Sequence, residues 1–261
     1  MQNKECCTPQ KNRINYQKEL EKLLASLEAE RISGNGKKKR LLLHACCAPC
    51  SSYVLEYLRE KFDITVLYYN PNITEREEYE KRSAELKRLA RQMNQESAGA
   101  GQPEKGSVPT EPTALPSGFI LVEEGEWEPQ RFFEVSKGLE SLPEGGERCF
   151  RCYELRLRET ARIAAERGFD YFTTTLTISP LKNAEKLNEI GALMAEEYGV
   201  AFLPSDFKKK NGYKRSVELS EKYGLYRQDY CGCIFSRAER DRRKADGQPT
   251  DAVTVLRKAE L

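Results

Sequence analysis

Short apolar runs alternate along the chain with longer segments whose apolar positions recur every three or four residues. The first run, Leu41-Leu-Leu-His-Ala45, is continuous, as is typical of a strand buried on both faces of a parallel sheet. The same reasoning predicts further strands at residues 64–69, 119–122 and 171–175. Helices are expected between and after them, at residues 51–61, 74–94, 129–139, 152–167 and 183–198. The alternation predicts an α/β fold with a doubly wound parallel sheet, followed by a helical C-terminal part.

Segments of different character flank or interrupt this pattern. Residues 1–39 are expected to form a polar leader with one amphipathic helix at 16–32, whose leucines (Leu20, Leu23, Leu24 and Leu27) share one face. Residues 40–244 are expected to form the catalytic domain, and residues 245–261 a C-terminal tail. Residues 95–118, rich in Gly, Pro, Ser and Glu, are interpreted as a flexible insertion. Thr74 and Glu77 predict a capping box at the start of the 74–94 helix.

Composition and charge narrow the class of protein. The 261 residues carry 43 basic and 41 acidic side chains, a net charge of +2 that neither requires nor excludes a nucleic-acid partner. No apolar run approaches the roughly 18 residues of a membrane span. The first residues have no apolar core of a secretion signal. We therefore expect a cytoplasmic protein that does not contact the membrane.

The cysteine and histidine content limits the kinds of metal site that this chain can form. The chain has nine cysteines and a single histidine, His44, which we expect to pack at the end of a strand. With one imidazole, a metal site must use thiolates, which favour zinc, cuprous copper or iron–sulfur clusters. Cys6 and Cys7 lie in the leader without site-like neighbours. The other seven form three clusters: Cys46, Cys47 and Cys50; Cys149 and Cys152; Cys231 and Cys233.

The first cluster follows the first predicted strand, at the sheet edge where α/β proteins bind ligands. A 4Fe–4S cluster needs four thiolates, and Cys46, Cys47, Cys149 and Cys152 can supply them. Cys50 would then remain with Cys231 and Cys233. A disulfide across Cys231-Gly-Cys233 would be strained and labile, which suits a redox pair. The alternative is structural zinc on Cys46 or Cys47 with Cys50, Cys149 and Cys152.

The residues around these cysteines are more specific than their spacing. The chain contains, in order, His44-Ala-Cys-Cys-Ala-Pro-Cys50, Tyr69-Asn-Pro-Asn-Ile73, Cys149-x-x-Cys-Tyr-Glu-Leu-Arg-Leu157, Ser179-Pro-Leu-Lys182, Asp206-Phe-Lys-Lys-Lys210 and Leu225-Tyr-Arg-Gln-Asp-Tyr-Cys-Gly-Cys233. This set resembles the QueH family of epoxyqueuosine reductases, which carry out the last step of queuosine formation on tRNA. The resemblance covers residues 41–244, apart from the insertion.

The resemblance implies a HUP-type α/β fold and reduction of epoxyqueuosine to queuosine in the anticodon loop of tRNA. It further implies a 4Fe–4S cluster on Cys46, Cys47, Cys149 and Cys152, fed by an external electron donor. Cys231 and Cys233, with Cys50 nearby, would form a redox disulfide or hold a second metal, a mononuclear iron or zinc.

Two other functions remain alternatives. One is a zinc-stabilised RNA-binding module without redox activity. The other is an ATP-using tRNA-thiolating enzyme of the same fold. The second would need a glycine-rich phosphate loop after the first strand. This chain has Ala45-Cys-Cys-Ala-Pro-Cys50 at that position. The segment contains no glycine, and its proline lacks the N–H that would bind a phosphate.

Epoxide reduction also needs an acid and an RNA surface. With no spare histidine, the candidate acids are Asp206, Asp229 and Tyr230. The candidate RNA-binding residues are Lys208, Lys209, Lys210, Tyr213, Lys214 and Arg215. Phe207 and Tyr213 are expected to stack on anticodon-loop bases. Residues 237–244 form a second basic cluster, interrupted by Glu239 and Asp241.

Overall fold

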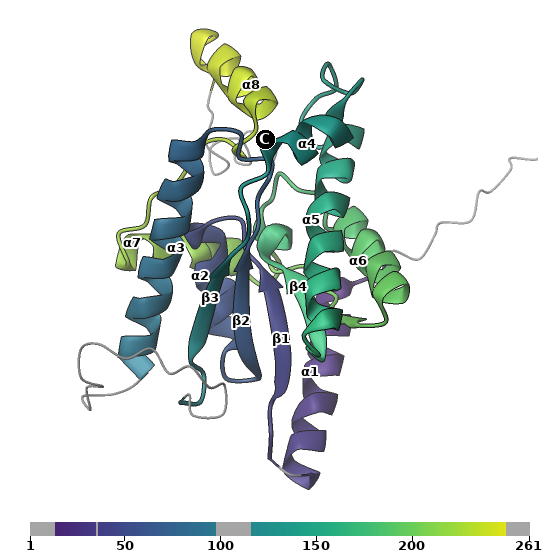
Figure 1. Ribbon diagram of the computed structural model, residues 1–261. Coiled ribbons are helices and arrows are strands. Elements are labelled where there is room, and N and C mark those ends of the chain that lie inside the picture. Colours follow the sequence, from purple (N-terminus) through teal and green to yellow (C-terminus); the bar gives the residue numbers. More distant parts are fainter. Residues whose placement is uncertain (1–13, 35, 98–115, 249–261) are drawn as a thin grey trace, which may run out of the picture.

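The computed structural model describes residues 14–34, 36–97 and 116–248 (Figure 1). Cys6 and Cys7, most of the 95–118 insertion and most of the C-terminal tail lie outside the described residues. None of the described helices combines the length and apolarity that a membrane span requires. The elements in chain order are α1 (Tyr16–Ser33), β1 (Lys39–His44), α2 (Ala48–Leu58), β2 (Phe62–Tyr68), α3 (Arg76–Ser97), β3 (Ile120–Glu124), α4 (Pro129–Ser136), α5 (Glu147–Glu166), β4 (Tyr171–Thr174), η2 (Thr175–Ile178), α6 (Ala184–Tyr198), β5 (Ala201–Phe202), α7 (Gly212–Lys222) and α8 (Ile234–Ala245).

Five parallel strands form one sheet in the order β3-β2-β1-β4-β5. The predicted α/β class with a parallel sheet is confirmed, and the two-residue strand β5 is an addition that its short sequence could not reveal. The chain first builds outward from β1 through β2 to β3, then returns to build through β4 and β5. The carboxyl ends of β1 and β4 therefore flank the switch point at which such sheets bind ligands.

The core lies on both faces of the sheet because neighbouring strand residues point to opposite sides. Leu41 and Leu43 belong to one buried cluster with residues of α2, α3 and α7, whereas Leu42 belongs to another with residues of α5 and α6. Leu20 and Leu24 of α1 join the first cluster, so the predicted N-terminal helix packs against the domain. Figure 1 shows α2, α3 and α7 on one side of the sheet and α5 and α6 on the other.

The predicted capping box at Thr74 is wrong. Helix α3 begins at Arg76, and the backbone N–H of Thr74 donates to the carbonyl of Gly232 at 3.3 Å. In a capping box that N–H would be bound by the Glu77 side chain. A tertiary contact with the Cys231–Cys233 loop thus replaces the local motif at this helix start.

The C-terminal part is helical, as predicted, and consists of α7 and α8. Helix α7 packs against α2. Helices α8 and α4 both lie beyond the upper ends of the strands in Figure 1. Helix α7 begins at Gly212, where an added Cβ would collide with the carbonyl oxygen of Phe207 and the ring of Tyr53. Only glycine allows the turn after Phe207 to come this close to α2.

We expect Gly212→Ala to lower the free energy of unfolding by about 3 kcal/mol, because the colliding atom is backbone and cannot rotate away. Gly224→Ala is the matched control. Gly224 has a φ of +56° but no atom near the added Cβ, so only left-handed strain of about 1 kcal/mol is expected. Urea unfolding of both variants measures the difference. Equal losses would show that the close approach at Gly212 does not constrain the fold.

Candidate functional site

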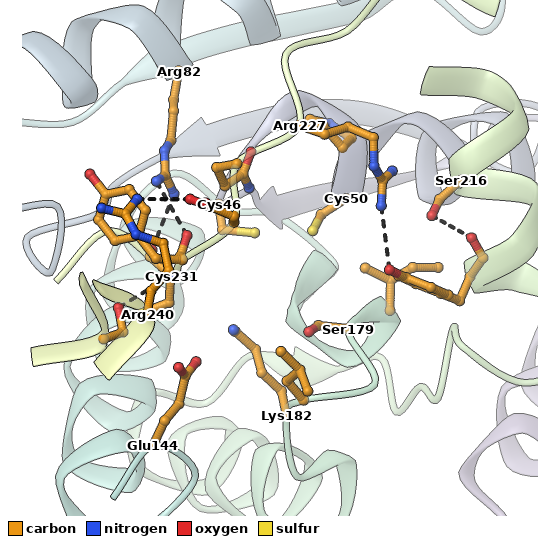
Figure 2. Close-up of a pocket in the computed structure, with 18 of the residues that line it drawn as sticks. Cys46, Cys50, Arg82, Glu144, Ser179, Lys182, Ser216, Arg227, Cys231 and Arg240 are labelled. Carbon is orange, nitrogen blue, oxygen red and sulfur yellow. Dashed lines mark hydrogen bonds and ion pairs between the residues drawn. The ribbon is translucent and has the colours of Figure 1, made fainter. Parts of the chain in front are cut away.

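A cavity of about 260 Å³ lies at the carboxyl-terminal edge of the sheet. The loop after β1 contributes Cys46, Pro49 and Cys50 to its wall, and the segment after η2 contributes Ser179 and Lys182. Residues 227–231 and helix α8 complete the wall. Figure 2 shows side chains from these separate segments converging on one space. The backbone N–H of Cys46 donates to Thr175 Oγ1 at 3.4 Å, which ties the β1 end to the β4 end.

Cys46, Cys47 and Cys50 form a compact thiol triad at the amino end of α2. Their Sγ atoms all lie within 4.8 Å of one another, and those of Cys46 and Cys47 are 3.7 Å apart. Cys47 is the N-cap residue, in an extended conformation that directs the chain into the helix. Across the described ranges, this triad is the one group of three His, Cys, Asp or Glu side chains compact enough to hold a single metal ion.

The three thiols of the triad differ in how easily they ionise. Hydrogen bonds from the Cys47 and Cys50 thiols hold the pKa of Cys46 well below its usual value. Donating to Cys46 raises the pKa of Cys47 to about 12, and donation together with burial raises that of Cys50 well above its usual value. Cys46 is therefore the thiol of the triad that ionises most readily. A thiolate is the form of cysteine that binds metals, so Cys46 is the best prepared of the three as a ligand.

Cys231 and Cys233 form a second thiol pair, with their Sγ atoms 3.5 Å apart and not bonded. Gly232 between them has a φ of +112°, and its added Cβ would collide with Ile73. Cys233 is the N-cap residue of α8, and its Sγ accepts from the backbone N–H of Ser236 at 3.3 Å. The Cys231 thiol and the Ser236 groups lower the pKa of Cys233 to about 7, despite its burial. The pair thus holds one readily formed thiolate.

Cys149 and Cys152 lie in the first two turns of α5, which begins at Glu147, before the expected start. The Sγ of Cys149 accepts from the backbone N–H of Gly145 at 3.2 Å. Cys152 packs with Cys233 and partly buried Cys231 in one apolar cluster, and burial raises its pKa to about 11. Cys46, Cys50 and Cys231 line the cavity, and Cys152 of the α5 pair lies next to it through its packing with Cys231 and Cys233. The α5 pair is not part of the compact triad.

His44 is a buried hydrogen-bonding residue, as expected from its position. One ring nitrogen lies 3.1 Å from the Tyr69 carbonyl, which can only accept, so that nitrogen carries the proton. The other lies 2.9 Å from the Thr174 hydroxyl. Burial, aided by nearby Arg156, lowers the pKa of His44 to about 3. The imidazole is neutral and both nitrogens have partners, so it is not available as a metal ligand.

Two cations face the thiols from the opposite wall of the cavity. Arg156 of α5 is 3% exposed, and its Nε donates to the Cys152 carbonyl at 3.1 Å. Burial acts to lower the pKa of Arg156, but Cys152, Cys46 and Cys231 raise it overall. Lys182 points into the cavity in Figure 2, across from Cys46 and Cys231. Both cations favour the thiolate forms of these cysteines.

A third buried cation, Arg82 of α3, holds the Cys231–Cys233 loop in place. It is 2% exposed and forms an ion pair of 2.7 Å with Glu78. Its Nη1 donates to the carbonyl of Cys231 at 3.1 Å and its Nη2 to that of Tyr230 at 3.4 Å. Arg82 thus fixes two successive carbonyls immediately before Gly232, and with them the position of the second thiol pair.

The comparisons with known proteins agree with this site. The family model described as epoxyqueuosine reductase QueH matches residues 41–239. The chain is a member of the QueH family. Proteins named epoxyqueuosine reductase QueH are similar over most of its length. The one from Staphylococcus epidermidis is 38% identical over 86% of this chain and 85% of its own. That of Streptococcus pyogenes is 39% identical over 86% and 78%, and that of Thermotoga maritima 34% over 79% and 94%.

The region matched to the QueH family contains all seven described cysteines and all of the cavity wall up to Glu239. These cysteines are free thiols. The donor set fits a thiolate-ligated metal or cluster, because Cys46, Cys50 and Cys231 line one cavity that buried arginines also line. The triad alone is compact enough for one ion.

The three candidate acids lie in different settings. Asp206 pairs with Lys208 at 2.6 Å and does not line the cavity. Asp229 lines it but pairs with Arg240 at 2.8 Å and Lys244 at 2.7 Å. Partial burial acts to raise the pKa of Asp229, but the two cations lower it overall, so it is ionised and holds no proton to give. Tyr230 lines the cavity between Arg82 and Arg240, and burial raises its pKa.

Most of the candidate RNA-binding residues are exposed, namely Lys209, Lys210, Lys214 and Arg215. Of these, Lys210 pairs with Glu21 and Arg215 with Glu56. Lys208 is partly buried and pairs with Asp206. Tyr213 lines the cavity. The expectation that Phe207 stacks on bases is wrong, because its ring is 1% exposed and packs in the core, 6.3 Å from that of Tyr57.

The second basic cluster, residues 237–244, lies on α8, and Arg240 and Arg243 line the cavity. Both arginines pair with neighbouring carboxylates, Arg240 with Asp229 and Arg243 with Glu239. Their positions at the cavity wall make α8 a boundary of the site. The sequence alone left their role open because Glu239 and Asp241 interrupt the basic run.

Sequence reasoning missed Arg82, Arg156 and Lys182. A signal for the first two was present, since each arginine interrupts an otherwise apolar helical stripe. Arg82 lies in the buried row with Tyr79, Leu86, Leu89 and Met93 of α3. Arg156 lies in the corresponding row of α5. A charged residue in such a row must have buried partners. Lys182 lies in a loop, and its signal was its place in the Ser179-Pro-Leu-Lys182 motif.

We expect Arg82→Met to lower the free energy of unfolding by about 3 kcal/mol, because Glu78 and two carbonyls lose their partner in a buried setting. The matched control is Arg88→Met. Arg88 also lies on α3, pairs with Glu85 and donates to the carbonyls of Tyr223 and Gly224, but is 34% exposed. Its loss should cost less than about 1 kcal/mol. Urea unfolding of the metal-free proteins measures both, and equal losses would refute the anchoring role of Arg82.

Proposed function

We propose that this protein reduces the epoxide of epoxyqueuosine in the anticodon loop of tRNA to the alkene of queuosine, the last step of queuosine formation. The observation that carries the proposal is the convergence of cysteines from the first and last clusters, Cys46, Cys50 and Cys231, with three buried or partly buried cations on one cavity, in a chain of the QueH family. Thiols and thiolate-bound metals supply electrons. The cations suit a reaction in which an oxygen atom develops negative charge.

The reaction removes one oxygen atom from the substrate. It takes up two electrons and two protons, breaks both C–O bonds of the epoxide, and releases water. A cavity of about 260 Å³ is at the small end of ligand sites, which suits one ring of a modified base extruded from an RNA loop. Tyr213 at the wall, near the guanidinium of Arg227, offers an aromatic face for that base.

Cys46, Cys47, Cys149 and Cys152 are the residues that would hold a 4Fe–4S cluster, which would relay single electrons from an external donor. Cys50, Cys231 and Cys233 would hold a second metal, iron or zinc. Alternatively, Cys231 and Cys233 would act as a dithiol that forms a disulfide, giving up the two electrons and two protons directly, until the donor reduces it again. The 3.5 Å separation of the two sulfurs supports the dithiol reading.

The surroundings of the cavity support an RNA partner. Exposed Lys209 and Lys214 lie on either side of the start of α7, near Tyr213 in the wall. Lysines at such positions bind phosphates without reading sequence, which leaves recognition to the modified base in the cavity. Free thiols and a tRNA substrate both suit work in the reducing cytoplasm.

Anaerobic purification tests the cofactor. We expect a brown protein with a broad absorbance near roughly 400 nm and about four irons and four sulfides per chain. Serine at Cys46, Cys47, Cys149 or Cys152 should remove most of the iron and the colour. Serine at Cys231 should leave the cluster iron in place but abolish conversion of a stem-loop RNA carrying epoxyqueuosine. Mass spectrometry measures that conversion as the loss of one oxygen atom.

A colourless protein with one zinc and no sulfide, even after anaerobic reconstitution, would contradict this function. It would instead favour a zinc-stabilised RNA-binding module, for which the compact Cys46, Cys47 and Cys50 triad is the specific supporting observation. In that case the stem-loop RNA would bind without losing its epoxide oxygen under any reductant.

The double variant Lys209→Ala/Lys214→Ala tests the RNA surface. We expect weaker tRNA binding and a salt dependence whose slope falls by about 1.5, because two phosphate contacts are lost. Fluorescence anisotropy across a salt series measures both. Lys22→Ala, which removes an exposed lysine of α1, is the matched control and should leave the slope unchanged. An unchanged slope in the double variant would exclude this surface as the RNA contact.

A further inference from the structure

Lys182 has a setting unlike that of the other lysines around the site. It follows the turn at residues 179–182, in which its backbone N–H donates to the Ser179 carbonyl at 3.2 Å. Its side chain lines the cavity, and Figure 2 shows the amino group pointing into the open space that Glu144, Cys231 and Cys46 also face. Within the described residues, its Nζ has no hydrogen bond or ion pair of contact distance. An ammonium group held this way is ready to bind an oxygen atom of a ligand.

The charges around Lys182 keep it protonated. Burial acts to lower its pKa, but Tyr153, Glu144, Cys231 and Cys46 raise it overall. Cys46 belongs to the triad and Cys231 to the α8 pair, the groups of thiols at which the electrons would arrive. The ammonium therefore faces the reducing groups across the cavity, and a substrate between them would contact both sides.

The other groups in the cavity wall that carry a proton are less suited to donate it to the epoxide oxygen. Asp229 is ionised between two cations. The ring of Tyr230 lies between the guanidinium groups of Arg82 and Arg240, 5.2 and 4.7 Å from its centre. The Ser216 and Ser236 hydroxyls donate to the carbonyls of Tyr213 and Cys233. Lys182 alone among these groups carries a proton on an atom without a competing partner.

We propose that Lys182 is a catalytic residue that binds the epoxide oxygen and donates the first proton as the ring opens. This inference rests on the proposed function. Two electrons from an external one-electron reductant enter the substrate. The first C–O bond breaks, and its oxygen, now an alkoxide, takes the Lys182 proton. The second C–O bond then breaks, a proton from solvent completes the leaving water, and solvent also restores the ammonium through the open cavity. An alkoxide is far more basic than an amine, so this transfer is downhill even from a strongly protonated lysine.

Binding without turnover gives the first test. Stem-loop RNAs carrying epoxyqueuosine or queuosine are titrated with no reductant present. The wild-type protein should prefer the epoxide by roughly tenfold, the contribution of one hydrogen bond from a charged donor. Lys182→Met should lose this preference while binding the queuosine RNA as before. Lys182→Arg should keep it, because a guanidinium still donates hydrogen bonds.

Turnover with dithionite gives the second test. Lys182→Met and Lys182→Arg should both lose roughly 10²–10⁴-fold in rate, since arginine holds its proton too tightly to give it away. Lys182→Ala should recover part of its rate in methylammonium, which can enter the space left by the side chain. Lys186→Met is the control, because Lys186 pairs with Glu189 on the surface of α6. Iron content and visible spectrum are measured for every variant.

The outcomes separate the two proposals. If the wild-type protein leaves the epoxide intact under dithionite, the proposed function fails. If it converts the epoxide and Lys182→Ala does so equally fast, the function stands and the role of Lys182 is overturned. A slow Lys182→Ala variant that keeps the epoxide preference and gains nothing from methylammonium overturns it as well, whatever its iron content.

Discussion

The balance between sulfur and buried positive charge is the constraint on which the rest of this structure depends. A thiolate in an apolar interior is costly unless a cation or hydrogen-bond donor faces it. Here Arg82, Arg156 and Lys182 approach the thiols from three elements, and the amino ends of α2, α5 and α8 lie beside them. The cations are equally dependent on the sulfurs and on Glu78, because burial alone would favour their neutral forms. Neither set would be stable at this edge of the sheet without the other.

This mutual dependence also changes how easily individual thiols ionise. Hydrogen bonds from its two thiol neighbours lower the pKa of Cys46, and those from Cys231 and Ser236 lower the pKa of Cys233 to about 7. The carbonyl anchors from Arg82 fix the backbone of the second thiol pair. A metal or cluster would enter a ready ligand set, and little backbone rearrangement would oppose its binding.

Local patterns predicted the architecture well, and tertiary contacts account for what they missed. Continuous apolar runs identified four of the five strands, because a strand buried on both faces has a distinctive composition. The two-residue β5 has no such signal. The capping box at Thr74 failed since the Gly232 carbonyl competed for the same N–H. Phe207 was expected to face RNA because it lies among lysines, yet a single aromatic residue in a basic run packs inward when a helix such as α2 lies beneath it.

The candidate site was predictable to the extent that its residues are rare. Cysteine clusters stand out in a chain of otherwise ordinary composition, and the motif order predicted the QueH family from the sequence alone. The spacing of Cys46, Cys47 and Cys50 predicted that they lie together, but how near the other cysteines come depends on the packing of separate segments. Lys182 lies in a motif that the sequence singles out, but its role was not predictable because it depends on the direction of one side chain in a loop.

The parallel topology has a consequence for the order in which this molecule matures. Its three thiol clusters come from residues 46–50, 149–152 and 231–233, which are synthesised at widely separated times. The triad is synthesised first, and its compact geometry allows it to capture a single ion before its intended partners exist. Helix α8, which positions the last pair, is among the final described segments to emerge. A metal site built from all three clusters would therefore be complete only when nearly the entire domain has been made, and until then the triad would be open to a competing ion such as zinc.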